Sequence, residues 1–418
     1  MDLESTTADF RFPNVGSCDS IRRMPTGPTP IPPASLRTIL TLTGASFCVG
    51  ACLRITDPLL PKIAQEFAVG LGSVSIVVTA FSVAYGLLQL VYGPIGDRFG
   101  KFRLITLAMA VSAVTIAAAA WAQSLGALAA LRLMAGATTA AVVPTLLAYV
   151  GDVVAYERRQ AVLARVLTGN LMGVVLGQSI AGVLIEYVSW RTVFLVLGGT
   201  YLFVAFLLWT ELRSPRVVRT RNDTPLNPRR LAGRYIGLLR DRNPRAILAM
   251  IFLEGFLFFG AFPFMGSYLR HDFGLDYATI GLMLGGFGIG GMCYSLFAGW
   301  FVPTFGEVGL LRVGGILIAG GFAGLAAATV WWLAIPLIVA LGLGLFMVHN
   351  TLQTNATQMA PDARGLAVSG FAFCLFAGQA AGVAVVGQAI DRTDHEPVFV
   401  AIGVAMLVAS WLFAARRR

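Results

Sequence analysis

The sequence has 418 residues, of which 57% are hydrophobic and only 12% are charged, and its formal net charge is +10. Because a soluble protein of this size carries about 25% charged residues, the composition excludes an ordinary soluble domain and indicates a membrane protein. The 47 glycines agree with this, since glycine is more frequent in membrane helices than in soluble ones. The five cysteines are scattered without a CxxC pair, so we expect no disulfide framework and no metal site.

Twelve stretches of the sequence are long and apolar enough to span a membrane, which takes about 20 residues. In the first half they are 37–59, 73–95, 104–122, 125–149, 161–187 and 191–211. In the second half they are 246–269, 277–301, 309–329, 332–357, 366–390 and 396–415. Segment 1–36 is expected to be a disordered cytoplasmic tail and segment 212–245 a polar cytoplasmic linker. The predicted fold is therefore an all-α membrane protein with two six-helix bundles, 37–211 and 246–418.

The basic residues gather on one side of this predicted topology. If both termini are cytoplasmic, most of the 31 Lys and Arg residues lie in the cytoplasmic segments. This is the positive-inside pattern, and it accounts for the basic net charge without nucleic acid as a partner. We therefore expect both termini to be cytoplasmic. Basic residues that are mostly Arg rather than Lys indicate a bacterial inner membrane as the lipid bilayer. We expect the chain to act as a monomer.

Small residues recur at four-residue spacing in one predicted span of each half. The two stripes are Gly169, Gly173, Gly177 and Ala181, and Gly370, Cys374, Gly378 and Gly382. Such stripes let helix backbones approach closely. A matching stripe in each half indicates two structural repeats, a construction common among secondary transporters.

A charged, glycine-punctuated stretch, 93–103, is predicted to form the tight loop between spans 73–95 and 104–122. It resembles the signature G-x-L-A-D-R-x-G-R-K of the major facilitator superfamily, matched here by Gly93, Ile95, Gly96, Asp97, Arg98, Gly100 and Lys101. In that family the segment makes a charge-relay contact that holds the outward-facing state, and the resemblance implies this gating role for Asp97 and Arg98. A decayed copy at 299–306 has Pro303 and Thr304 in their places, so we expect the first half to carry the stronger gate.

Two further segments are similar to motifs of the same family. Arg132-Leu-Met-Ala-Gly136 resembles R-x-x-Q-G, with alanine for glutamine. The stripe Gly169, Gly173 and Gly177, continued to Gly182, resembles the antiporter motif G-x3-G-x3-G-P-x-x-G-G, with Gln178 for proline. The resemblance implies the twelve-helix drug:proton antiporter branch, whose driving force is a proton gradient and which uses no cofactor.

Ionisable residues inside a span are costly to bury and are by default functional candidates. Arg54 and Asp57 lie three residues apart near the outer end of the first span, and Arg132 enters the fourth span from the same side. Asp57 could pair with either arginine. The pair is either a static link between two spans or a site where Asp57 exchanges between arginine and a proton.

Glu254 lies near the predicted bilayer centre of span 246–269, among apolar neighbours. Because burial there disfavours its charged form, we expect Glu254 to bind and release protons or to bind a cationic substrate. A permanently protonated, hydrogen-bonding Glu254 is the alternative. The other polar residues of the spans are candidates either for lining a substrate cavity or for interhelical hydrogen bonds; they are Asn170, Gln178, His349, Asn350 and Gln379.

The predicted function is proton-coupled efflux of small amphipathic or cationic compounds by alternating access. The alternatives are uptake or exchange of a specific metabolite, such as a sugar or an organic anion, and a transporter-like membrane sensor. An enzyme is not expected, because the sequence shows no nucleophile with its base, no metal cluster and no phosphate-binding loop.

Overall fold

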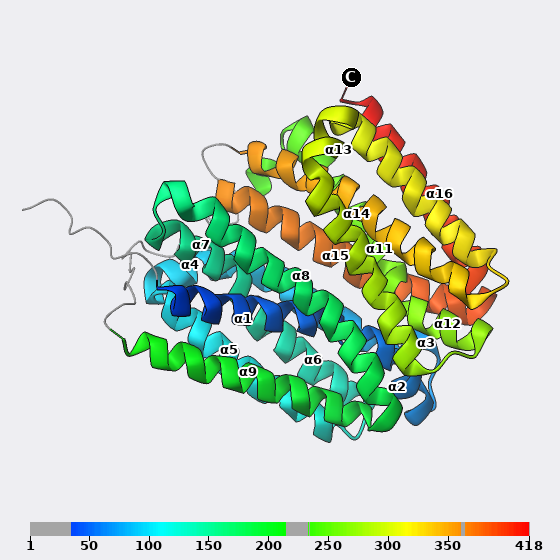
Figure 1. Cartoon of the computed structure of the whole chain (residues 1–418), viewed down its shortest axis with the longest axis horizontal. Coiled ribbons are helices and arrows are strands. Elements are labelled where there is room, and N and C mark those ends of the chain that lie inside the picture. Colours follow the sequence, from blue (N-terminus) through cyan, green and yellow to red (C-terminus); the bar gives the residue numbers. More distant parts are fainter. Residues whose placement is uncertain (1–34, 215–232, 234, 361–363, 418) are drawn as a thin grey trace, which may run out of the picture. The chain divides into compact units, whose positions relative to one another are not determined.

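The computed structural model describes residues 35–214, 233, 235–360 and 364–417, all within one compact unit, Pro33–Arg418. Most of the predicted tail and much of the predicted linker lie outside these residues. The described residues form helices and no strand (Figure 1). Eleven of the described helical stretches are long and apolar enough to cross a membrane. The predicted all-α membrane fold is thus confirmed.

The first half contains α1 (Leu36–Arg54), η1 (Asp57–Leu59), α2 (Leu60–Glu66), α3 (Leu71–Val74), α4 (Ile76–Phe99), α5 (Lys101–Ala118), η2 (Ala119–Trp121), α6 (Leu125–Thr139), α7 (Val142–Val153), α8 (Tyr156–Tyr187) and α9 (Trp190–Leu212). The second half contains α11 (Arg242–Ala261), η3 (Phe262–Phe264), α12 (Met265–Phe273), α13 (Tyr277–Ala326), η4 (Trp331–Leu333), α14 (Ala334–Gln358), α15 (Arg364–Thr393) and α16 (His395–Ala415). We call the end of the unit where α1 begins and α9 ends the linker side, and the opposite end the far side.

Polar side chains cap several helices where the chain re-enters the apolar segments. The Ser35 hydroxyl accepts a hydrogen bond from the Thr38 amide at 3.1 Å and starts α1. Ser124 does the same for α6, and the Asp276 carboxylate accepts from the Thr279 amide at 2.8 Å to start α13. The hydrogen bonds from Thr279 lower the pKa of Asp276, so this cap is charged at neutral pH.

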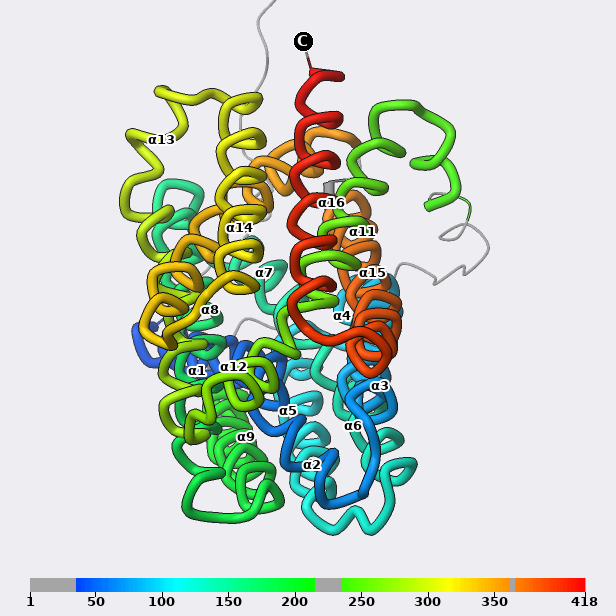
Figure 2. The backbone as a smooth tube through the Cα atoms, turned by 90° about the vertical axis from the view of Figure 1, so that its right-hand side faces the viewer, coloured from blue at the N-terminus to red at the C-terminus, as the bar shows by residue number. Residues whose placement is uncertain are grey.

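The charged stretch 93–103 is almost entirely helical, which corrects the predicted loop. α4 continues to Phe99 and α5 begins at Lys101, so Gly100 alone, with φ of 92°, separates them. Spans 277–301 and 309–329 likewise join in α13, which is broken at Gly306 with φ of 58° (Figure 2). A side chain is strained at such φ values. The decayed copy of the charged motif has thus kept its glycine turn although its charged residues are gone.

The two small-residue stripes pack in the same way in the two halves. A Cβ on Gly173 of α8 would overlap the Phe47 carbonyl oxygen of α1, and a Cβ on Gly378 of α15 would overlap the Phe252 carbonyl oxygen of α11. One turn further, a Cβ on Gly177 would lie 2.7 Å from the Ala51 Cα. These close approaches let α8 lie against α1 and α15 against α11, as expected of two structural repeats.

The first spans of the two halves are both broken near a proline. Pro58 follows Asp57 in η1, between α1 and α2, and Pro263 follows Phe262 in η3, between α11 and α12. Proline lacks the amide that would continue the helical ladder. Asp57 therefore lies within the interior of a 31-residue apolar segment, Leu36–Glu66, rather than at the end of the predicted span 37–59.

Candidate functional site

Asp57 forms the centre of a buried polar cluster at the break between α1 and α2. Its Oδ2 lies 3.5 Å from the Arg54 guanidinium nitrogen Nη1 and accepts a hydrogen bond from Gln178 Nε2 at 3.3 Å. Asp57 and Gln178 are both fully buried, and Arg54 is 6% exposed. Of the two possible partners predicted for Asp57, the structure pairs it with Arg54.

Aromatic side chains of the second half cover Arg54. The guanidinium carbon lies 4.4 Å from the ring centroid of Phe259 and 5.3 Å from that of Phe262. These two residues precede Pro263 with the same spacing at which Arg54 and Asp57 precede Pro58. The charged pair of one repeat thus faces an aromatic pair at the equivalent place in the other, where cation–π attraction stabilises the arginine.

Two acceptor oxygens of this cluster lack a hydrogen bond. Among the described residues, Asp57 Oδ1 and Gln178 Oε1 are buried without one, and Arg54 Nη1 has only its ion pair with Asp57. A buried polar group without a partner costs about 1–3 kcal/mol. Atoms held at this cost in one place can bind a proton or a polar group of a ligand.

Arg132 lies apart from this pair, inside the first half. Its guanidinium donates hydrogen bonds to the Cys52 carbonyl oxygen at 3.4 Å and to Cys52 Sγ at 3.7 Å, and its carbon lies 4.2 Å from the Phe81 ring centroid. Only 1% of Arg132 is exposed. Arg132 therefore links α6 to α1 and places a positive charge near Asp57 and Arg54. Its contact with substrate stays a prediction.

Glu254 pairs with His349 across α11 and α14, so it is not the isolated carboxyl that the sequence indicated. Glu254 Oε1 lies 2.6 Å from His349 Nδ1, and Glu254 is fully buried whereas the His349 side chain is 22% exposed. Oε2 of Glu254 has no hydrogen-bond partner among the described residues. A fully buried carboxyl group and a partly exposed imidazole are thus in direct contact here.

Three other predicted cavity residues form hydrogen bonds with the protein, two of them to another helix and one within its own helix. Asn170 donates to the Ser46 carbonyl oxygen at 3.0 Å and joins α8 to α1. Gln379 donates to Ser82 Oγ at 3.0 Å and joins α15 to α4, which links the two halves. Asn350 donates to the carbonyl oxygen of Phe346, one turn earlier in its own helix. Interhelical hydrogen bonding therefore describes Asn170 and Gln379 well.

In the charged motif, Lys101 rather than Arg98 is the partner of Asp97. Lys101 Nζ lies 2.9 Å from Asp97 Oδ1 and 2.5 Å from Oδ2 of Asp152, which lies near the end of α7. The Arg98 guanidinium lies over the ring of Phe99. Within the described ranges, neither Asp97 nor Arg98 forms an ion pair or hydrogen bond with the second half, and their gating role stays a prediction.

The remaining motif glycines have different surroundings. Gly96 lies against Thr145, whereas a Cβ on Gly93 would meet nothing within 4 Å. A Cβ on Gly182 would lie 2.6 Å from the Cα of Gly281, so the last glycine of the antiporter-like motif lets α8 approach α13 of the other half. Gly169 lies against Thr43 of α1.

Polar contacts between the halves gather on the far side. Asp391, at the end of α15, accepts hydrogen bonds from the backbone amides of Leu71 at 2.9 Å and Gly72 at 2.8 Å. Glu186 of α8 accepts from the Tyr277 amide at 2.8 Å. On the linker side, the Tyr235 hydroxyl of the predicted linker segment donates to the Leu90 carbonyl oxygen. The structure is therefore closed on the far side.

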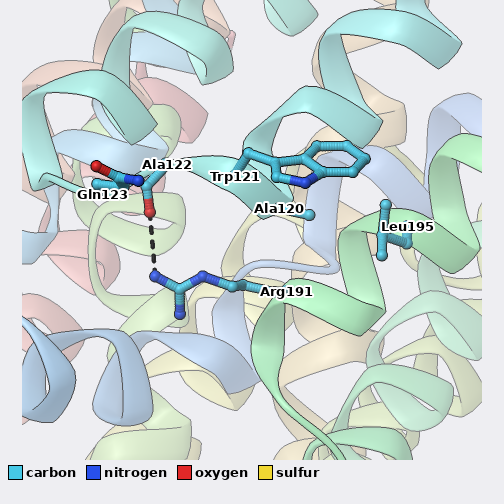
Figure 3. A pocket seen from close by; sticks show the side chains of 6 residues that line it. All are labelled: Ala120, Trp121, Ala122, Gln123, Arg191 and Leu195. Carbon is cyan, nitrogen blue, oxygen red and sulfur yellow. Dashed lines mark hydrogen bonds between the residues drawn. The ribbon is translucent and has the colours of Figure 1, made fainter.

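A shallow pocket on the far side of the first half is structural in character. It is lined by Ala120, Trp121, Ala122, Gln123, Arg191 and Leu195 (Figure 3). Arg191 donates to the Ala122 carbonyl oxygen at 3.1 Å and forms an ion pair with Glu66, which also accepts from the Trp190 indole. These bonds fasten the end of α2 to the start of α9.

Sequence reasoning missed the partners that other helices supply. The partner of Gln379 is Ser82, and the partner of Lys101 is Asp152. The backbone amides at the start of α3 bind Asp391. Asp152 and Asp391 were visible as acids next to the ends of predicted spans, at 149 and 390. Ser82 carried no signal, because a serine within a span usually bonds its own helix.

A model of the Major Facilitator Superfamily matches residues 42–383. The chain is 26% identical over 359 residues to "Uncharacterized MFS-type transporter YceJ" of Bacillus subtilis, with 84% of this chain and 88% of that protein covered. It is 23% identical over 361 residues to Multidrug resistance protein 1 of the same organism, with 84% of this chain and 90% of that protein covered.

Among solved structures, a D323A mutant of the nucleoside transporter NupG is similar with a TM-score of 0.74 at 13% identity. The match covers 91% of this chain and 100% of that one. At this identity the likeness shows a shared fold. It agrees with the helical arrangement described above and with the repeated packing of its two halves.

Proposed function

Because this chain belongs to the major facilitator superfamily, we propose that it is a proton-coupled transporter that exports small amphipathic or cationic compounds by alternating access. The coarser statement, a multi-pass membrane transporter with a small-molecule substrate, follows from the family. We assign it to a bacterial inner membrane as a monomer, with both termini cytoplasmic and the proton gradient as its driving force. Nucleic acid and cofactors have no part in the proposal.

The observation that carries the proposal is a buried carboxyl group in the first span of each half. Asp57 lies beside Arg54, and Glu254 lies beside His349. Each carboxyl group keeps one oxygen without a hydrogen-bond partner among the described residues. A carboxyl group inside a membrane segment is costly unless it is used, and proton relays in transporters are built from such groups.

The closed far side supports alternating access. If the termini are cytoplasmic, a far side held by Asp391 and Glu186 corresponds to an inward-facing state. The Asp97–Lys101–Asp152 group then lies on the open side, where it is free to engage the second half when the transporter turns outward. Export is further favoured by the glycine stripe of α8 and by the likeness to a protein named for multidrug resistance.

The test is transport by the purified protein in liposomes with an imposed pH gradient. A panel of cationic, neutral and anionic compounds is offered, and substrate movement and lumenal pH are recorded together. We expect a cationic or amphipathic compound to move against the protons, and its movement to stop when an ionophore collapses the gradient. Protein-free liposomes supply the background for each compound.

A second candidate is exchange or uptake of an organic anion. It is favoured by two buried arginines, Arg54 and Arg132, of which only Arg54 has a carboxylate partner among the described residues. In the same assay this alternative predicts that an anion moves together with the protons. If only anions move, and in that direction, the export proposal is wrong.

Neutralising the charged motif is expected to slow the cycle without weakening substrate binding. Asp97→Asn removes one of the two carboxylates that hold Lys101. A partly exposed ion pair is worth about 0.2–1 kcal/mol, so turnover should fall by no more than about fivefold. Initial rates measured over a range of substrate concentrations separate the two effects. A variant that lost affinity at unchanged turnover would place Asp97 in the binding site instead of the gate.

A further inference from the structure

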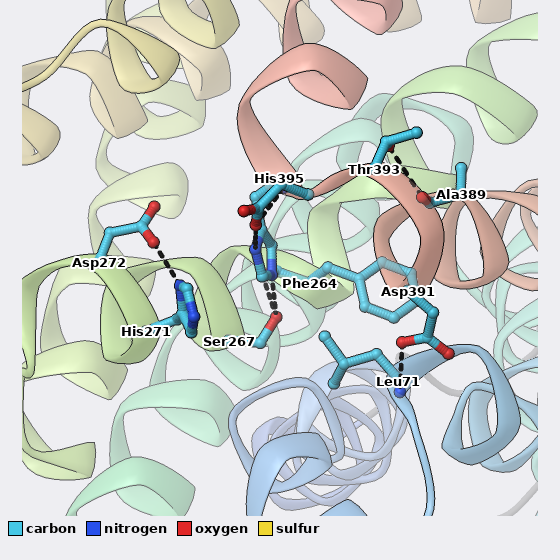
Figure 4. Close-up of polar contacts among 10 residues, drawn as sticks. Leu71, Phe264, Ser267, His271, Asp272, Ala389, Asp391, Thr393 and His395 are labelled. Atoms are coloured by element: carbon cyan, nitrogen blue, oxygen red, sulfur yellow. Dashed lines mark hydrogen bonds and ion pairs between the residues drawn. The ribbon is translucent and has the colours of Figure 1, made fainter.

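Two of the three histidines of the chain meet on the far side, away from the buried carboxyl groups. His271 lies near the end of α12 and His395 at the start of α16 (Figure 4). Asp394 lies between α15 and α16, next to His395. One possible ligand atom from each of the three residues lies within 4.8 Å of the others. From the sequence we expected no metal site. The three residues come together only in the fold, because His271 is far along the chain from the other two.

Hydrogen bonds orient His395 for metal binding. The Ser267 hydroxyl donates to the Phe264 carbonyl oxygen at 2.7 Å, so its single proton is already used. Ser267 Oγ lies 3.0 Å from His395 Nε2 and must accept from an Nε2–H group. A neutral His395 therefore has its lone pair on Nδ1, the nitrogen that lies 3.4 Å from Asp394 Oδ1.

A carboxylate orients His271 in the same manner. His271 Nδ1 lies 2.6 Å from Asp272 Oδ1, which indicates that Nδ1–H donates to the carboxylate. The lone pair of a neutral His271 is then on Nε2. A carboxylate behind the imidazole is a usual second contact of a metal-binding histidine, because it fixes the tautomer and raises the basicity of the ligand.

The backbone of the following residue fixes the Asp394 carboxylate in place. Asp394 Oδ1 accepts a hydrogen bond from the His395 amide at 3.0 Å. Its φ of 114° is a strained value for a residue other than glycine. Strain of this kind is kept where the surroundings require one conformation, and here that conformation places a carboxylate beside two imidazoles.

We propose that His271, Asp394 and His395 bind one divalent transition-metal ion of the zinc class on the far side of the second half. Two imidazole nitrogens and one carboxylate oxygen are a usual set for zinc, with the fourth position left to water or another ligand. Nitrogen donors disfavour calcium and magnesium, which take oxygen ligands. Around a tetrahedral zinc, ligand atoms lie about 3.3 Å apart. The His271 side chain is 68% exposed and can turn inward to reach this spacing.

The probe is Zn²⁺ itself, titrated into the full-length, tag-free protein in detergent in competition with a chromophoric chelator. We expect one tight site per chain. His271→Ala and Asp394→Asn should each weaken binding at least tenfold, and the double variant His271→Ala/His395→Ala should abolish the site. Asp272→Asn should weaken binding about 10- to 100-fold, which is the usual effect of losing the group behind a ligating imidazole.

The matched control is Glu396→Gln, a neighbouring acid in the first turn of α16 that is not part of the set. It should bind Zn²⁺ as the wild type does. Thermal unfolding adds an independent readout, because an ion that binds the folded state raises the melting temperature. Zn²⁺ should raise it for the wild type and Glu396→Gln, but not for the double variant.

Folding does not obscure the result. The exposed His271 side chain can be truncated without opening the core, and the elution profile of His271→Ala checks this directly. A folded His271→Ala protein with wild-type affinity for Zn²⁺ would overturn the proposal. Absence of any stoichiometric binding to the wild type would overturn it as well.

Discussion

Glu254→Gln is expected to reduce proton-driven transport in liposomes to the protein-free background while leaving the protein folded. The amide keeps the size of the side chain and can still accept a hydrogen bond from His349, whose Nδ1 lies 2.6 Å from Glu254 Oε1. It cannot take up or release a proton. If Glu254 carries the coupling proton, exchange of substrate without a pH gradient should persist, because the binding and closing steps remain.

The control is Glu307→Gln, which neutralises an exposed acid of the same half and should transport as the wild type does. Asp57→Asn, tested beside it, shows which of the two buried carboxyl groups carries the proton. Loss of gradient-driven transport in Asp57→Asn but not in Glu254→Gln would transfer the role to Asp57. Unchanged transport in both variants would remove proton coupling through these groups from the mechanism.

Gly173→Ala is expected to be strongly destabilising for a single methyl addition. The new Cβ would overlap the Phe47 carbonyl oxygen, which is backbone and cannot turn aside. Overpacking of this kind costs about 1–3 kcal/mol and occasionally more. Because α8 packs along α1 at this point, the melting temperature of the detergent-solubilised protein should fall clearly.

Gly199→Ala is the matched control, since a Cβ there would meet nothing within 4 Å. In a helix this exchange should be neutral or stabilise by up to about 1 kcal/mol. The repeat also predicts that Gly378→Ala is as harmful as Gly173→Ala, because its Cβ would overlap the Phe252 carbonyl oxygen. A Gly173→Ala protein as stable as Gly199→Ala would show that the two helices separate at little cost.

The spans and the close helix pairs could be predicted because their signals are local. Some twenty apolar residues in a row predict a membrane helix by themselves. The spacing of Gly169, Gly173 and Gly177 predicts a smooth helix face without knowledge of what covers it. The helix boundaries were less accurate, and α4 runs four residues beyond the predicted end at 95, to Phe99. Glycine and proline within 93–100 indicated a loop, but a single glycine makes the turn.

The pairings within the candidate site could not be predicted, because spacing along a helix does not reveal which helices are neighbours. Glu254 and His349 were both recognised as polar residues in spans, yet their contact depends on α11 lying beside α14. For the same reason Arg132 was an open partner for Asp57. In the structure, Arg132 donates hydrogen bonds to Cys52 of α1, and its guanidinium lies over the rings of Phe81 and Phe194.

The far-side closure has a consequence for how this protein can vary in evolution. Asp391 holds the other half through the backbone amides of Leu71 and Gly72, which every amino acid except proline possesses. A substitution of Leu71 therefore leaves the bond intact, whereas a Cβ at Gly72 would lie 2.9 Å from Asp391 Oδ2. Related sequences should thus restrict position 391 to an acid and position 72 to glycine while position 71 varies freely. Methods that detect contacts from correlated substitutions would miss this one, although it joins the two halves of the transporter.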